Sequence, residues 1–221
     1  MMKLAVVSKY DVKHLAKKYF KIVKSNPDFV LAYGGDGTLL FAEKLYPNIP
    51  KIFVKHKSSC RSCKLLNLEN VLKKVANGNY KIKELIKLEA NVNGKKFVAL
   101  NDINIHYIPP EALRFFVYVN GKKVNGEFIG DGVVVCTPFG STAYFKSITR
   151  KTFNKGIGIA FNNTTRFQKP KVVSEDSKIV VGITRGSGVV VADNQKPIKI
   201  KKGDKVKVKK YKENAKIVII H

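Results

Sequence analysis

The run Tyr33-Gly34-Gly35-Asp36-Gly37-Thr38 constrains the fold of this chain more than any other stretch. It follows the apolar residues 29–32 and precedes residues 39–45, whose pattern predicts a helix. Glycines at a strand-to-helix turn adopt backbone angles that a Cβ forbids. They also let backbone amides approach a phosphate beside the positive end of the helix. The run therefore predicts a phosphate-binding turn in an α/β fold.

Asp36 is the unusual residue of this turn, because a carboxylate is out of place as a phosphate binder. It suits a group that takes a proton from an attacking hydroxyl or holds a metal ion. A competing interpretation is a tight turn in which Asp36 caps the helix. Thr38 is a second candidate for that cap, and this choice leaves Asp36 free for chemistry. GGDG alone favours the simple turn.

The first third of the chain alternates strand and helix patterns, which predicts a parallel α/β unit. The expected strands span residues 4–7, 29–33 and 52–54. A helix is expected from Asp11 to the stop at Asn26-Pro27, with an apolar face of Leu15, Ala16, Tyr19, Phe20 and Val23. Another is expected from Asn67 to the stop at 77–79, with Leu68, Val71, Leu72 and Val75 facing inward.

After Tyr80 the pattern changes to short apolar runs between turn signals. Asn93-Gly94 and Asn120-Gly121 predict tight hairpins, and residues 202–204 predict another turn. The runs between them suit an antiparallel sandwich and span residues 97–100, 115–119, 132–136, 178–183, 189–192, 206–208 and 217–220. We therefore expect two domains, residues 1–78 and residues 79–221.

Two further strings of the second part carry polar groups suited to a nucleotide. One is Asn101-Asp102, which leads into a strand, and the other is the stretch 130–144, GDGVVVCTPFGSTAY. Asn, Asp, Thr and Tyr supply donors and acceptors for ribose and base edges, and Ala and Gly leave room for a flat ring. Taken singly, the first string is typical of a turn and the second of a helix start.

Together and in this order, the three strings resemble the NAD kinase family, whose marks are a GGDGT segment, an Asn-Glu pair and a DG-hydrophobic-TPxGSTAY segment. GGDGT is shared with lipid kinases, and GGDGS with phosphofructokinases, so the TPxGSTAY string makes the distinction. Residues 193–195 and 198–206 look like a later stretch of the same family. The resemblance implies an α/β N-terminal domain and a β-sandwich C-terminal domain, with the C-terminus returning to the first domain.

The resemblance also implies an activity, the transfer of a phosphoryl group from ATP or polyphosphate to the 2′-hydroxyl of the adenosine ribose of NAD. Asp36 is then the catalytic base, and Gly34 and Gly35 bind phosphate. The implied substrate-binding residues are Gly37, Thr38, Asn101, Asp102, Asp131, Thr142, Ala143, Tyr144, Phe145, Lys146, Ser147 and Gln195. No protein metal ligand is assigned, since Mg²⁺ binds mainly through donor phosphates and water. In the family a neighbouring subunit completes the pocket, so we expect a homo-oligomer, a dimer or tetramer.

This sequence departs from the family in the loop after the third strand. The family's glycine-rich loop is replaced by residues 55–63, KHKSSCRSC. Two interpretations stay open: Lys57 and Arg61 bind the donor phosphates by charge, or these residues form a solvated loop. The family's Asn-Glu pair is Asn101-Asp102 here. The altered loop keeps a second hypothesis open, a non-catalytic dinucleotide-binding paralogue, although the retained Asp36 favours the enzyme.

The formal net charge of +26 is nearly all lysine and is scattered along the chain. A dedicated nucleic-acid reader usually clusters arginine and interleaves aromatics, so we expect no specific nucleic-acid partner. No apolar run is long enough to span a bilayer, and the first residues predict a buried strand rather than a signal peptide. We expect a cytoplasmic protein. Cys60 and Cys63 lack the second pair of a zinc site, and Cys136 is expected to be a buried thiol.

Overall fold

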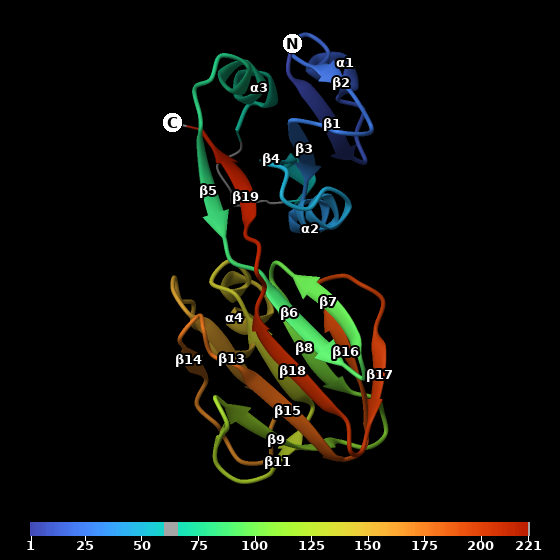
Figure 1. Cartoon of the computed structure of the whole chain (residues 1–221), viewed down its shortest axis with the longest axis vertical. Coiled ribbons are helices and arrows are strands. Elements are labelled where there is room, and N and C mark those ends of the chain that lie inside the picture. Colours follow the sequence, from blue (N-terminus) through green and yellow to red (C-terminus); the bar gives the residue numbers. More distant parts are fainter. Residues whose placement is uncertain (60–65, 221) are drawn as a thin grey trace. The chain divides into compact units, whose positions relative to one another are not determined.

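The computed structural model describes residues 1–59 and 66–220, which form two compact units. Unit 1 comprises residues 1–85 and the C-terminal segment from Asn214, and unit 2 comprises Ile86–Glu213. The sheet of unit 1 has the order β2-β1-β3-β4-β19-β5 (Figure 1). Its strands are β1 (Lys3–Ser8), β2 (Lys21–Ile22), β3 (Phe29–Gly34), β4 (Lys51–Lys55), β5 (Lys81–Leu85) and β19 (Ala215–Ile219). Neighbouring strands from β2 to β19 are parallel, as the alternating pattern predicts, and β5 is antiparallel to β19.

The helices of unit 1 are α1 (Lys13–Ala16), α2 (Asp36–Leu45), the short η1 (Lys57–Ser59) and α3 (Leu68–Ala76). In α3 the apolar positions Val71, Leu72 and Val75 are buried as predicted, and the Asn67 side chain accepts a hydrogen bond of 3.0 Å from the Asn70 amide. An ion pair between buried Glu43 and buried Lys51 links α2 to β4.

The first predicted helix is much shorter than its apolar pattern indicates. α1 ends at Ala16 rather than before Asn26, because the chain turns back and β2 pairs with the edge of β1. Phe20 is still buried in the core of unit 1, as the apolar pattern requires, but from an irregular turn. The pattern therefore identified the buried face correctly and the element wrongly.

Unit 2 is an antiparallel sandwich, as the sequence predicts (Figure 1). One sheet contains β6 (Leu88–Val92), β7 (Lys95–Ala99), β9 (Leu113–Val119), β10 (Lys122–Lys123), β11 (Phe128–Gly130), β15 (Ile179–Arg185) and β18 (Lys205–Lys210). The other contains β8 (Asp102–Tyr107), β12 (Gly132–Cys136), β13 (Ile157–Asn162), β14 (Lys171–Val173), β16 (Ser187–Ala192) and β17 (Ile198–Lys201). Asn93-Gly94 and Asn120-Gly121 form the predicted hairpin turns, with φ positive at all four residues.

Apolar side chains from both sheets form the core of the sandwich. A smaller cluster lies on the outer side of β12 and β13, where the short η2 (Gly140–Thr142) and α4 (Tyr144–Thr149) cover the sheet. Cys136 is a free, buried thiol of this cluster, as expected. Burial raises the pKa of that thiol, so it is an inert core residue.

The C-terminal run 217–220 is not part of the sandwich, although its apolar pattern suits one. It forms β19, which lies between β4 and β5 in the sheet of unit 1 (Figure 1). Unit 1 also extends past residue 78, because β5 pairs along its whole length with β19. A local pattern shows that a segment is a strand, but tertiary contacts determine which sheet that strand joins.

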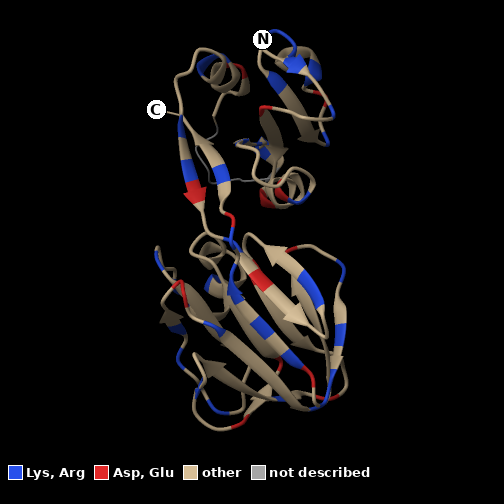
Figure 2. Cartoon of the chain, viewed as in Figure 1, with Lys and Arg blue, Asp and Glu red and all other residues tan. Residues whose placement is uncertain are grey.

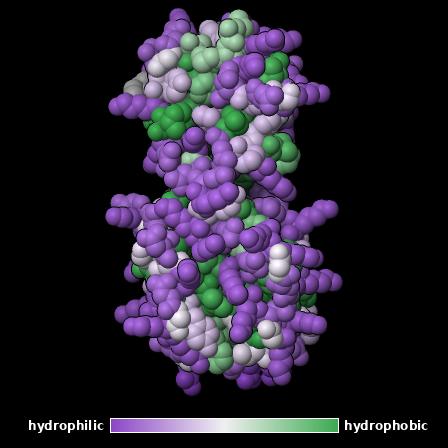
Figure 3. All heavy atoms as spheres, viewed as in Figure 1, coloured by the Kyte–Doolittle hydropathy of each residue, from purple (hydrophilic) through white to green (hydrophobic). Residues whose placement is uncertain are grey.

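Lysines and arginines are spread over both units (Figure 2), and hydrophilic residues cover most of the visible face of each (Figure 3). Among the described residues, no helix has the length and apolar character needed to cross a membrane.

Candidate active site

The GGDGT turn of unit 1 joins β3 directly to α2. Gly34 has a φ of +156°, and a Cβ at this position would lie 2.3 Å from Oγ1 of Thr38. Only glycine therefore fits under the first turn of α2. Gly35 is the N-cap in an extended conformation, and no side chain caps the helix. Neither cap candidate is used, so Asp36 and Thr38 both lie within the first turn of α2.

The carboxylate of Asp36 is paired with the ammonium group of Lys55, at 3.0 Å between Oδ1 and Nζ. The Asp36 side chain is 58% exposed, and Lys55 is the last residue of β4, in register with Gly34 of β3. An exposed pair of this kind contributes only about 0–1 kcal/mol to stability. It can therefore rearrange when a ligand arrives, which leaves one carboxylate and one cation beside the amides of the turn.

Lys55 is a candidate phosphate-binding residue that the sequence analysis did not select. Residues at the carboxyl ends of adjacent parallel strands lie side by side, so the expected strands at 29–33 and 52–54 already implied this position. Lys57, which was selected, is exposed on η1. Arg61, with Cys60 and Cys63, lies outside the described residues. The assignment of Lys57 and Arg61 to the donor phosphates stays a prediction.

In unit 2 the Asn101-Asp102 segment is held by the carboxylate of Asp193. Asp193 accepts hydrogen bonds from the backbone amides of Leu100 and Asn101 at 2.8 Å and of Asp102 at 3.2 Å. Asp193 therefore positions the start of β8, a role that the sequence analysis did not assign to it. The sequence feature that could have identified Asp193 is its position in the string 193–195, which is part of the family resemblance.

Two side-chain oxygens beside this segment are buried without a partner. Within the described residues, Oδ1 of Asn101 and Oδ1 of Asn104 are enclosed and accept no hydrogen bond. A buried acceptor left unpaired costs about 1–3 kcal/mol. Asn104 lies two residues after Asp102 on β8, so the two side chains share one face of the sheet. Unpaired acceptors in this segment are suited to a ligand that brings hydrogen-bond donors.

Asp102 has an unusual protonation equilibrium. Burial, with a smaller contribution from the negative charge of Asp193, raises the pKa of Asp102 to about 7. The carboxyl group thus titrates near neutral pH, where it can donate a hydrogen bond as well as accept one.

The TPxG stretch packs directly on the Asn101 backbone. A Cβ at Gly140 would lie 2.1 Å from the Asn101 carbonyl oxygen, so only glycine permits this approach. The Thr137 hydroxyl donates to the Leu100 carbonyl at 2.7 Å and accepts from the Gly140 amide at 3.0 Å. The fold therefore joins two of the strings found in the sequence into one site.

Tyr144 at the start of α4 belongs to the same neighbourhood. Its hydroxyl accepts a hydrogen bond of 3.0 Å from Asn162, and Asp131 accepts one of 3.2 Å from Asn163. Burial raises the pKa of Tyr144, the Asn162 hydrogen bond opposes that shift, and the negative charges of Asp131 and Asp102 add to it. The structure thus brings Asp102, Asp131 and Tyr144 together.

Other predicted residues of unit 2 are placed differently. Phe145 is 1% exposed and its side chain packs in the cluster of Val134, Cys136 and Ala160, so its assignment to the substrate stays a prediction. Gln195 donates to the Val98 carbonyl at 2.6 Å, a bond that ties two segments of the sandwich together. The exposed predicted residues are Thr142, Ala143, Lys146 and Ser147.

Residues 1–59 and 66–220 contain no group of three or more His, Cys, Asp or Glu side chains that could hold a metal ion. A cation held mainly by substrate phosphates and water needs at most one or two carboxylates, and exposed Asp36 provides one. The donor set therefore fits Mg²⁺ bound to a phosphorylated ligand.

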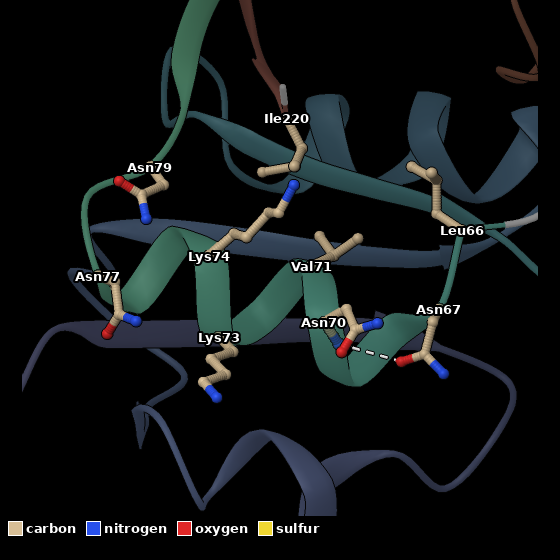
Figure 4. A pocket seen from close by; sticks show the side chains of 9 residues that line it. All are labelled: Leu66, Asn67, Asn70, Val71, Lys73, Lys74, Asn77, Asn79 and Ile220. Atoms are coloured by element: carbon tan, nitrogen blue, oxygen red, sulfur yellow. Dashed lines mark hydrogen bonds between the residues drawn. The ribbon is translucent and has the colours of Figure 1, made fainter.

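A cavity of about 490 Å³ lies beside α3 in unit 1 (Figure 4). Its lining includes the helix cap Asn67, Lys74 and Ile220, but no carboxylate, hydroxyl or thiol. Its only ionisable side chains are Lys73 and Lys74, so it lacks the carboxylate that the turn at Asp36 provides.

Comparison with protein families and curated proteins identifies relatives. Residues 100–220, more than half of the chain, match the model of the ATP-NAD kinase C-terminal domain. The NAD kinase of Saccharolobus solfataricus is 30% identical over 94% of this chain and 86% of that protein. The NAD kinase of Sulfurisphaera tokodaii is 39% identical, over 71% of this chain and 63% of that protein.

Solved structures show the same fold. The yeast NADH kinase in complex with NADH has a TM-score of 0.88 at 15% identity and covers 100% of this chain and 84% of that one. An NAD kinase from Archaeoglobus fulgidus in complex with ATP has a TM-score of 0.79 at 24% identity and covers 98% of this chain and 93% of that one. Sequence relatives and fold agree, and the chain belongs to the NAD kinase family of enzymes.

Proposed function

We propose that this protein transfers the terminal phosphoryl group of ATP to the 2′-hydroxyl of the adenosine ribose of NAD, giving NADP and ADP. The observation that carries the proposal is the Asp36 carboxylate, set among the glycines of a phosphate-binding turn and 3.0 Å from Lys55. The relatives named NAD kinase and the ATP complex of one of them support the same substrates.

Asp36 acts as the general base. It accepts the proton of the 2′-hydroxyl as the ribose oxygen attacks the terminal phosphorus, and the bond from that phosphorus to the leaving ADP breaks. Lys55 and the amides of the turn stabilise the charge on the transferred group, which provides most of the catalysis in a loose transition state. Mg²⁺, when bound to the donor phosphates, neutralises further charge.

The adenosine half of NAD binds to unit 2. Asn101 and the segment Thr142-Ala143-Tyr144 hold the adenosine, and Asp102 and Asp131 hold the ribose and nicotinamide side. The unpaired Oδ1 of Asn101 supports this assignment. Asn101→Ala is expected to raise the KM for NAD by about tenfold with little change in kcat, because it removes binding common to ground and transition states. An unchanged KM in steady-state kinetics contradicts the placement.

The active protein is proposed to be a homo-oligomer. The exposed apolar side chains Phe167 and Val172 of unit 2 support this, since such residues are typical of contact surfaces. Light scattering coupled to size exclusion gives the mass of the active species, and a fully active monomer rules out a shared pocket.

The test of the function is NADP formation by the purified protein. NAD and Mg²⁺ are supplied with ATP or with polyphosphate, and NADP is measured with an NADP-specific dehydrogenase. The proposal predicts NADP with ATP, and the polyphosphate arm shows whether the donor needs a nucleoside. NAD binding without NADP formation from either donor overturns the proposal in favour of a non-catalytic paralogue.

A further inference from the structure

An aromatic cluster lies at the carboxyl edge of the sheet of unit 1. It consists of Tyr10 after β1, Tyr33 in β3, and His56 after β4. The strand order β2-β1-β3-β4 makes the gap between β1 and β3 a topological switch point, because β1 leads to β2 on one side and β3 to β4 on the other. In open parallel sheets, ligands bind outside the carboxyl ends of the strands at such a point.

The rings of Tyr10 and His56 are stacked, with centroids 3.8 Å apart and planes inclined by 23°. Ser58 fixes the pair, since its hydroxyl lies 2.6 Å from the Tyr10 hydroxyl and 2.7 Å from Nδ1 of His56. The Ser58 amide also donates to Nδ1 of His56 at 3.2 Å. The stack is therefore held by hydrogen bonds at its rim and not only by ring contact.

Tyr33 contacts both rings of the stack edge-on. Its ring centre lies 5.8 Å from that of Tyr10 and 5.4 Å from that of His56, nearly perpendicular to both. A ring that is about equally far from two stacked rings stands beside them and not on top of either. Tyr10 is 40% exposed, so part of its side chain is accessible to a ligand from solvent.

This surface adjoins the phosphate-binding residues. His56 follows Lys55, whose ammonium group is 3.0 Å from Asp36, and the His56 amide donates to the Gly34 carbonyl at 3.1 Å. The sheet edge thus presents, side by side, two stacked rings suited to a base and a cation next to the phosphate-binding turn.

We propose that the Tyr10–His56 stack binds the base of the phosphoryl donor and thereby selects a nucleoside triphosphate over polyphosphate. This inference rests on the proposed function and adds the residues that recognise the base of the donor. A base stacked on Tyr10 places its phosphates toward Lys55 and the GGDGT turn. Polyphosphate has no base, so it gains nothing from the platform and depends on charge alone.

The variant that tests the platform is Tyr10→Leu, which keeps an apolar side chain and removes the ring. Tyr118→Leu, on the outer face of β9, is the matched control. The measurement is calorimetric affinity for a non-hydrolysable ATP analogue and, separately, for inorganic triphosphate, each without NAD. Stacking predicts that Tyr10→Leu lowers the affinity for the ATP analogue about tenfold and leaves the affinity for inorganic triphosphate unchanged. Tyr10→Phe, which keeps the ring, retains the affinity for the analogue.

Equal affinity of wild type and Tyr10→Leu for the analogue overturns the platform. An equal loss of affinity for the analogue and for inorganic triphosphate also overturns the platform, because that pattern indicates damage to the phosphate site. Thermal unfolding of each variant verifies that it is folded, and the ring-retaining Tyr10→Phe provides the test if Tyr10→Leu does not fold. These are binding measurements, so a failure of NADP formation counts against the proposed function alone.

Discussion

At the scale of single residues, Asp102 makes stability depend on pH. Its folded pKa of about 7 lies above the ordinary value of 3.8, so the unfolded chain releases this proton first as the pH rises. Asp102 therefore stabilises the fold fully below about pH 4, and this contribution declines by up to about 1.4 kcal/mol per pH unit toward pH 7.

The measurement is the free energy of unfolding by urea at several pH values, for wild type and Asp102→Asn. The difference between the two isolates this group from the other titrating residues. The variant is expected to gain stability relative to wild type between roughly pH 4 and pH 7, and to keep that gain at higher pH. A difference that does not change with pH contradicts the assignment.

At the scale of elements, Gly140 controls the junction between the TPxG stretch and the Asn101 segment. Gly140→Ala places a Cβ 2.1 Å from the Asn101 carbonyl, and the backbone must move apart at a cost of about 1–3 kcal/mol. Gly182→Ala is the control, since a Cβ there has no neighbour within 4 Å. In urea unfolding, Gly140→Ala is expected to have a lower free energy of unfolding than Gly182→Ala. Equal stability of the two variants shows that the junction is not tight.

The sequence predicted those elements whose signals are local. The GGDGT turn, the helix α3 and the two Asn-Gly hairpins depend on neighbouring residues, and the structure has them. The long first helix was misjudged, because the pairing of β2 with β1 is a tertiary contact. The local pattern also placed the run 217–220 in the sandwich, whereas the family resemblance correctly implied that the C-terminus returns to the first domain. Lys55 and Asp193 were missed because each acts on a segment distant in sequence.

At the scale of the whole molecule, the charge of +26 is expected to speed the capture of polyanions. The kcat/KM for ATP should therefore fall several-fold as NaCl rises from about 20 mM to 300 mM, because salt shortens the Debye length from about 20 Å to about 6 Å. The kcat/KM for NAD, which carries less charge, should fall less. Equal responses of the two substrates show that the lysines are a solvated surface without a kinetic role.

The central claim, that Asp36 is the base of a phosphoryl transfer to NAD, is tested most directly by a single turnover. Radiolabel is followed from the terminal phosphate of ATP into NADP, with excess wild-type or Asp36→Asn protein and with NAD affinity measured in parallel. Asn keeps the shape of Asp36 and removes the base, so the expected rate falls by about 10²–10⁴-fold while NAD affinity is preserved. An Asp36→Asn variant that transfers label at the wild-type rate contradicts the account.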